Sequence, residues 1–117
     1  RSDLNRANLS RTNLQDSNLG GANLSNTNFS GADLSRAYLG EADLSEADLS
    51  NANLSGANLA RADLTNTDLS QVNFAGANLR RADLSGANLT ATSLSTAKLC
   101  RTKLPNGSIE NRDCAAD

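Results

Sequence analysis

The sequence predicts an all-β protein in which the chain winds into a solenoid of square coils. Every fifth residue from Leu4 onward is Leu, with Phe29, Phe74 and the closing Ile109 as the exceptions. Each Leu sits in a five-residue unit of a small residue, Asp or Asn, Leu and two polar residues, as in 42–46. At 117 residues, the chain has the length of one domain built from such repeats.

The period of five excludes a helix and a flat strand. On an α-helix each residue turns about 100°, so leucines at this spacing would scatter around the surface. On a flat strand an odd period sends successive leucines to opposite faces. If the chain turns by about a right angle once per unit, every Leu points toward a common axis, and four units close a coil of about 20 residues. We therefore expect about five to six coils, joined by backbone hydrogen bonds as parallel strands are.

The unit 42–46 illustrates the place of each side chain. Ala42 lies two residues before Leu44 and shares its inward side, where the crowded axis favours a small residue. Asp43 lies between them and is expected to face outward. Ser45 and Glu46 are expected to form the corner, as polar and small residues commonly do in turns.

These units resemble those of the pentapeptide-repeat family, and the resemblance covers 22 consecutive units. It implies a right-handed quadrilateral parallel β-helix. The ending, with Leu-Pro-Asn-Gly and a late Cys, is similar to that of cyanobacterial and plant lumenal proteins made of little more than such repeats. Departures from the family pattern at the Asp or Asn position include Tyr38, Ser93, Lys98 and Lys103.

Residues 1–109 are predicted to form the β-helix and residues 110–117 a C-terminal cap. Pro105-Asn106-Gly107 predicts a turn before the pattern is lost. The two cysteines, Cys100 and Cys114, would fasten the tail over the last coil if they form a disulfide. A disulfide would indicate the periplasm, the thylakoid lumen or the cell exterior, whereas two free thiols would indicate the cytoplasm.

The N-terminal end is expected to need cover of its own. The chain opens on Arg1 already in register, so we expect that upstream residues were removed, either as a signal peptide or by trimming. An open coil exposes unpaired backbone groups together with Leu4 and Leu9, which removed residues or a partner would cover. The protein is accordingly expected to be a monomer or an end-to-end dimer.

Composition argues against catalysis, cofactors and metal binding. There is no His, which removes the commonest general base and metal ligand. The Ser residues are corner residues by periodicity, and carboxylates on a convex, solvated surface have nothing to separate their pKa values. Two cysteines without His are too few for a Zn site. No apolar run approaches the roughly 20 residues that span a bilayer. We expect no enzyme and no membrane association.

The net charge of −2 is unevenly distributed. Residues 41–70 contain six carboxylates and a single cation, Arg61. We call the six carboxylates the acidic surface: Glu41, Asp43, Glu46, Asp48, Asp63 and Asp68. The sign of the local charge reverses in residues 80–103, which contain one carboxylate, Asp83, and five cations: Arg80, Arg81, Lys98, Arg101 and Lys103. No aromatic residue is interleaved with these cations for base stacking, so nucleic-acid binding is not expected.

The sequence therefore favours a noncatalytic structural or protein-interaction module, which would bind an unidentified protein through one rigid face. The acidic surface is the first candidate for that face. The alternative comes from the family resemblance: members that confer quinolone resistance present an acidic rod to DNA gyrase as a mimic of DNA. The residues that would stand for phosphates here are Asp43, Glu46, Asp48, Asp63 and Asp68. A basic end and the lack of a projecting loop argue against this alternative.

Overall fold

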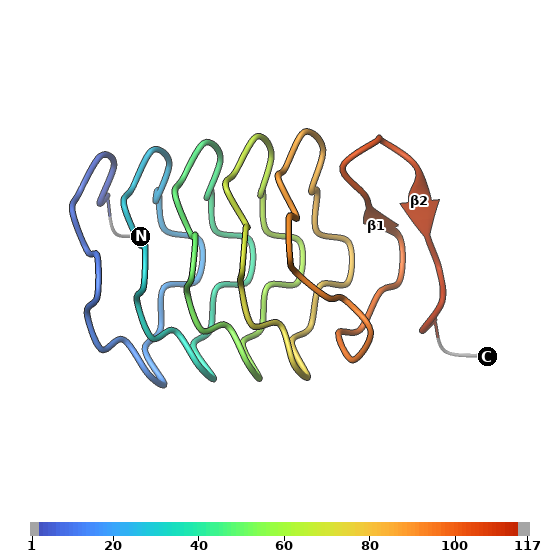
Figure 1. The fold of residues 1–117 in the computed structure, drawn as a ribbon, viewed down its shortest axis with the longest axis horizontal. Coiled ribbons are helices and arrows are strands. Elements are labelled where there is room, and N and C mark those ends of the chain that lie inside the picture. The colour runs from blue at the N-terminus through green and yellow to red at the C-terminus, as the bar shows by residue number, and fades with distance from the viewer. Residues whose placement is uncertain (1–2, 115–117) are drawn as a thin grey trace.

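The computed structural model describes residues 3–114, which wind into a stack of coils with overall dimensions of 39 × 26 × 20 Å. Figure 1 shows the coils side by side along the longest axis. From Asp3 to Asp68 the outward residue of each unit forms a parallel bridge with the residue 20 positions later, and Asn78 and Asp83 do so with Lys98 and Lys103. The predicted winding into coils joined by parallel pairing is therefore confirmed.

Backbone hydrogen bonds along the axis run in a fixed pattern. Leu44 donates its N–H to the carbonyl of Asp63 in the next coil at 2.8 Å, and Asp63 donates back to Ala42 at 2.9 Å. Ala47 N–H donates to the Leu44 carbonyl at 3.0 Å and closes the turn between the two units. Because the chain turns after every unit, each side holds a single bridged residue and no long strand develops.

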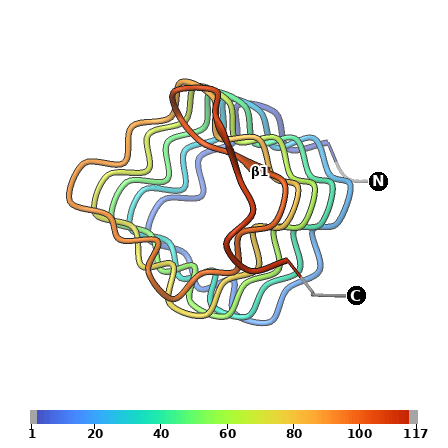
Figure 2. The same cartoon turned by 90° about the vertical axis from the view of Figure 1, so that its right-hand side faces the viewer.

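The bridges align the outward residues in four columns, one on each side of the coil. Face 1 carries Asp3, Asn23, Asp43, Asp63, Asp83 and Lys103. Face 2 carries Asn8, Asn28, Asp48, Asp68 and Asn88. Face 3 carries Asn13, Asp33, Asn53 and Asn73, and face 4 carries Asn18, Tyr38, Asn58, Asn78 and Lys98. Viewed along the axis, successive coils lie over one another (Figure 2).

Leucine side chains fill the axis of the solenoid. Those of the inner coils, such as Leu44 and Leu54, are fully buried, as are Phe29 and Phe74. In the first coil, Leu4, Leu9, Leu14 and Leu19 pack on the core but are only partly buried. The core is thus a column of stacked apolar layers, and its stability comes from contacts between neighbouring coils.

The corners carry an unusual backbone conformation. The second residue after each Leu commonly adopts a left-handed conformation, with φ of 60° at Glu41 and 59° at Glu46. A non-glycine residue in this region is destabilised by roughly 1 kcal/mol or more. The cost is offset because the outward Asp or Asn accepts the N–H two residues later, as Asp43 Oδ1 does from Ser45 at 3.0 Å.

The chain reverses direction at its C-terminal end. Strand β1, Thr102–Lys103, pairs antiparallel with strand β2, Ile109–Glu110, and Thr102 lies opposite Glu110. The chain between them turns at Gly107, which has a φ of 87° and donates its N–H to Leu104 at 2.8 Å. Ile109 was expected to close the inward series, but it is 54% exposed because this reversal takes it out of the coil.

Candidate interaction surfaces

The four aspartates of the acidic surface are half-buried and hydrogen-bonded to the corners that follow them. Asp43 Oδ1 accepts the N–H and hydroxyl of Ser45 at 3.0 and 2.6 Å, and Asp48 Oδ1 accepts those of Ser50 at the same distances. Asp63 and Asp68 make the same pair of bonds to Thr65 and Ser70. These side chains face outward as expected, and in addition one oxygen of each carboxylate bonds to a corner and stabilises it.

The structure brings the six predicted residues together in two stacks and two corners. Asp43 bridges with Asp63 on face 1, and Asp48 bridges with Asp68 on face 2. Glu41 and Glu46 lie on exposed corners beside these faces, and neither forms an ion pair within residues 3–114. The acidic surface is thus continuous around the corner between faces 1 and 2, and its two glutamates have the most accessible carboxylates.

At the C-terminal end of the solenoid, the last two residues of face 1 are an acidic residue, Asp83, and a basic residue, Lys103. Asp83 bridges with Lys103, and its Oδ1 accepts the N–H and hydroxyl of Ser85 at 2.9 and 2.6 Å. Burial raises the pKa of Asp83, but the bonds from Ser85 and the charge of Lys103 outweigh it and hold that pKa below its usual value. Arg81, two residues before Asp83, forms no ion pair with it in the described structure.

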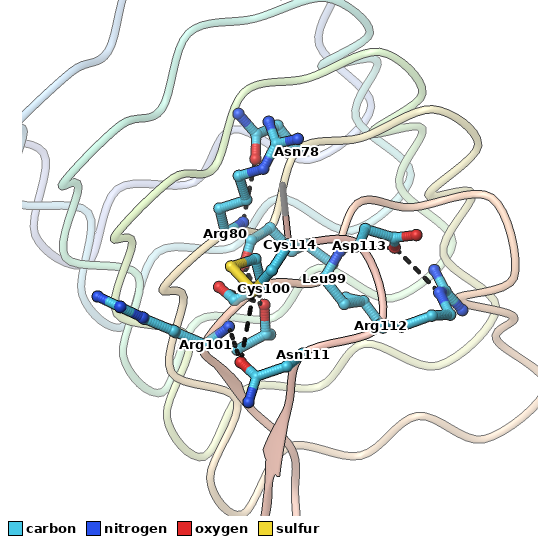
Figure 3. The surroundings of a disulfide bond; sticks show 11 residues. Asn78, Arg80, Leu99, Cys100, Arg101, Asn111, Arg112, Asp113 and Cys114 are labelled. Atoms are coloured by element: carbon cyan, nitrogen blue, oxygen red, sulfur yellow. Dashed lines mark hydrogen bonds and ion pairs between the residues drawn. A yellow bond between two sulfur atoms is a disulfide. The ribbon is translucent and has the colours of Figure 1, made fainter. Parts of the chain in front are cut away.

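Residues 111–113 provide hydrogen-bonding partners for the last coil. Leu99 N–H donates to Asp113 Oδ2 at 3.0 Å, and Arg101 N–H donates to Asn111 Oδ1 at 2.8 Å. Arg112 donates to the carbonyl of Leu94 at 3.1 Å and also to that of Ala97. The N–H groups of Leu99 and Arg101 and the carbonyl of Ala97 are groups that a further coil would pair with, so side-chain atoms substitute for its backbone (Figure 3). Figure 2 shows the end of the chain crossing the last coil.

A disulfide joins Cys100 of the last coil to Cys114, which follows these capping residues (Figure 3). This is the pairing that the sequence favoured over two free thiols. Asp113 lies directly before Cys114 and also contacts Arg112 Nε at 2.9 Å. The bond from Leu99 N–H, together with Arg112, holds the pKa of Asp113 below its usual value, against a smaller effect of burial.

Tyr38 on face 4 was not predicted to belong to a site, although its departure from the repeat was visible in the sequence. Its side chain is 45% exposed, and its ring lies across Gly20 and Gly40. A Cβ at Gly20 would come within 2.4 Å of the ring, and a Cβ at Gly40 within 2.5 Å of the hydroxyl. Tyr38 and Lys98, on the same face, cannot supply the acceptor that Asn58 offers to Ala60 N–H at 3.0 Å. Each such bond typically stabilises a fold by about 0.5–1.5 kcal/mol.

The repeats themselves identify the family. Residues 2–40, 32–71 and 67–104 match the description "Pentapeptide repeats", in 8 copies. The chain belongs to the pentapeptide-repeat family. No curated protein matches the chain.

Solved pentapeptide-repeat structures from cyanobacteria and a plant resemble it. HetL from Nostoc sp. strain PCC 7120, involved in regulation of heterocyst differentiation, is 36% identical over 92% of this chain and 53% of its own, with a TM-score of 0.41. The chain thus spans about half the length of HetL. A thylakoid-lumen protein of Arabidopsis thaliana, AT2G44920, is 26% identical over 84% of this chain and 72% of its own, with a TM-score of 0.51. The Nostoc protein alr5209 is 35% identical over 80% and 79%, with a TM-score of 0.47.

One corner in the described part of this pentapeptide-repeat protein is hollowed. The hollow has a volume of about 260 Å³ and is lined by Arg11, Ser30, Gly31 and Asn51. Within residues 3–114, no three Asp, Glu or Cys side chains gather as metal ligands would. No helix there is long and apolar enough to cross a membrane. The exposed charged and aromatic side chains of the flat faces and corners are therefore the groups available for recognition.

Proposed function

We propose that this protein is a noncatalytic interaction module that binds a protein partner through one rigid face of its solenoid. In this proposal the β-helix is right-handed and quadrilateral, runs in about five to six coils from the N-terminal repeats to the reversal at Gly107, and is closed by the residues after the reversal as a cap. The acidic surface, consisting of Glu41, Asp43, Glu46, Asp48, Asp63 and Asp68, is the contact. One observation carries this choice: the carboxylates of Glu41 and Glu46 are exposed beside two stacks of aspartates and form no ion pair within the described residues.

The test compares affinity capture by variants that leave the corners intact. Glu41→Gln with Glu46→Gln removes two charges from the acidic surface without touching a hydrogen bond of the corner. Asp3→Asn with Asp33→Asn removes two charges elsewhere and serves as the matched control. We expect a partner, identified by mass spectrometry and then rebound as a purified protein, to be lost with the first variant and kept with the control. Retention by both variants would show that the acidic surface is not the contact.

Replacing Asp43 or Asp48 with a cationic residue would be a poor test of whether the acidic surface is the contact. The Oδ1 atom of each residue accepts the N–H and hydroxyl of a corner serine, so such a change would also disturb the fold. Asn keeps an acceptor in the same place. Asp43→Asn with Asp48→Asn therefore removes charge with little effect on stability, and it extends the test to the half-buried part of the surface.

The second candidate function is inhibition or protection of DNA gyrase through mimicry of DNA. Supporting it, Asp43, Asp63 and Asp83 stack at one-coil intervals, and Asp48 and Asp68 stack in the adjoining column. With Glu46 between the columns, these carboxylates would take the place of phosphates. Purified gyrase in a supercoiling assay decides this point: an unchanged rate, with and without a quinolone, at micromolar protein would remove the candidate.

The proposed site of action is an oxidising compartment. The Cys100–Cys114 disulfide supports this, because such bonds persist in the periplasm, the lumen or the cell exterior and are rare in the cytosol. Intact mass before and after alkylation of protein isolated from its source, without reductant, counts the free thiols. Two free thiols would instead indicate that the protein is located in the cytoplasm.

A further inference from the structure

Face 4 is where the repeat departs from its own structural rules. An outward Asp or Asn accepts the N–H two residues later, and on this face Asn18 still does so from Gly20 at 3.1 Å and Asn78 from Arg80 at 3.0 Å. Among the described residues, three outward positions carry a side chain that cannot make this bond: Tyr38, Lys98 and Lys103. Tyr38 and Lys98 lie on face 4, and Lys103 lies on the neighbouring face 1. Each replacement costs its corner this hydrogen bond, which points to a role other than stabilising the corner.

Tyr38 is held flat on this face. Its ring crosses Gly20 and Gly40, and any side chain at either position would collide with it. Both glycines occupy the first corner position, which is Ser in units such as 42–46 and 47–51. Two consecutive coils thus lack a side chain where the ring lies. The tyrosine presents a fixed, partly exposed aromatic surface, which is a frequent anchor in protein interfaces.

Cations line the same face and one of its edges. Lys98 lies on face 4 itself, and Arg80, at the adjoining corner, is the one charged residue at a first corner position within units 3–99. Three arginines stack along the corner between faces 4 and 1, after Glu41 in the coil of Tyr38: Arg61, Arg81 and Arg101. Arg80 and Arg101 lie close to the Cys100–Cys114 disulfide (Figure 3). None of these five cations forms an ion pair with a carboxylate in the described structure.

The opposite edge of face 4, at its corner with face 3, has little side-chain bulk in two of the same coils. Its corner holds Gly56 and Gly76, both with left-handed φ, whereas Arg36 in the coil before them is paired with Asp16 at 3.0 Å. A ligand can therefore lie flat on face 4 against the ridge of arginines. From Tyr38 to Lys98 this path covers three strand spacings, or about 14 Å. An extended peptide covers that distance with about five residues.

We propose that face 4 binds an extended acidic segment of a protein partner, with an apolar side chain on the Tyr38 ring and carboxylates on Arg80, Lys98 and the arginine column. This inference rests on the proposed function, since it assumes a protein partner, but it places the contact on a different face. Charge complementarity selects the acidic segment, and arginine pairs carboxylates with two parallel hydrogen bonds. The Nδ2 groups of Asn58 and Asn78, whose Oδ1 atoms are used within the coil, can donate to the carbonyls of the segment.

The width of face 4 favours a peptide over a nucleic acid. Asp43, Asp63 and Asp83 stack on face 1, directly beyond the arginine column. A duplex extends past that corner and meets these carboxylates, whereas a single extended peptide is narrow enough to stay on one face. Only one aromatic ring is present on face 4, too few for stacking of successive bases.

The test uses a fluorescein-labelled peptide of about eight residues, in which glutamates surround a single leucine, and measures its anisotropy with the intact protein. Tyr38 is the sole tyrosine and there is no Trp, so intrinsic emission reports on this ring alone. We expect saturable binding that weakens with added salt and a saturable change in Tyr38 emission. Two variants introduce the residue that the repeat commonly carries at each position: Tyr38→Asn, and Arg80→Ser combined with Lys98→Asn. Each should preserve thermal stability and weaken binding about tenfold or more, equivalent to about 1.4 kcal/mol.

Arg6→Asn with Arg11→Asn is the matched control, because it removes two cations from other corners at positions where the repeat also carries Asn. This control should bind as the wild type does. Equal weakening by the control, equal binding of a peptide with lysines in place of the glutamates, or no saturable binding would overturn the proposal. Tighter binding of a thymidine oligonucleotide through Tyr38 and Lys98 would replace it with a nucleic-acid surface. A partner captured through Glu41 and Glu46 while the acidic peptide fails to bind would leave the proposed function standing and remove only this inference.

Discussion

Leu99 and Asp113 are joined by two hydrogen bonds in opposite directions. Leu99 N–H donates to Asp113 Oδ2 at 3.0 Å, and Asp113 N–H donates to the Leu99 carbonyl at 2.8 Å. In the inner coils, the corresponding N–H, such as that of Leu79, donates to a carbonyl one coil later. A carboxylate thus replaces the backbone of a coil, and the edge of the solenoid is paired at this point.

Asp113→Ala should loosen this end of the protein, since it leaves the N–H of Leu99 without its acceptor. We expect the Leu99 amide to exchange with solvent about tenfold faster or more, while amides of inner coils such as Leu54 stay unchanged. Hydrogen exchange followed by NMR measures both. Asp113→Asn keeps an acceptor and is the control. Unchanged exchange at Leu99 in the alanine variant would show that the carboxylate does not hold the coil edge.

The same bond predicts a dependence on pH. The pKa of Asp113 is lowered in the folded protein, so its ionised form stabilises the fold at pH values above the unfolded pKa of about 3.9. That contribution is lost as the pH falls below about 4 and through the folded pKa. The difference in melting temperature between wild type and Asp113→Asn should therefore be constant above about pH 5 and shrink below pH 4. A difference that stays constant to pH 2 would contradict this assignment.

Reduction of the disulfide should destabilise the cap before the coils. Cys100 and Cys114 are 14 residues apart in sequence, and a closed loop of about this length contributes roughly 3 kcal/mol through the unfolded state. Cys100→Ser with Cys114→Ser should lower the melting temperature and speed exchange of the Leu99 and Arg101 amides. The same reductant added to this double variant should have no further effect. A variant as stable as the oxidised wild type would show that the other cap contacts suffice.

The period of Leu was enough to predict the coil, because five is a spacing that neither a helix nor a flat strand can bury. It also placed Asp43 over Asp63 and Asp48 over Asp68, as the bridges confirm. The period could not show that these carboxylates turn back onto Ser45 and its equivalents, since that depends on the left-handed corner. It therefore overestimated how freely the acidic surface is exposed.

Two further features lay outside what the repeat could predict. Residues 111–113 follow no period, so their role became visible only when their side chains met the edge of the coil. The contact of Tyr38 with Gly20 joins residues 18 apart whose individual departures from the repeat looked unrelated. Folding in 20-residue turns brings them into contact. Residues that depart from a repeat can therefore be neighbours in space even when they are one coil apart in the sequence.

The burial gradient along the core gives the last prediction. Leu54 and Leu14 occupy equivalent positions in face 3, but Leu54 is fully buried and Leu14, in the first coil, is only partly buried. Leu54→Ala removes contacts with coils on both sides and should cost about 2–5 kcal/mol, as deletion of a buried leucine commonly does. Leu14→Ala should cost less than half as much, because solvent already reaches this side chain. Chemical denaturation of both variants, with equal slopes, measures the difference. Equal losses would mean that the first coil is covered in solution, by a partner or a second copy of the chain.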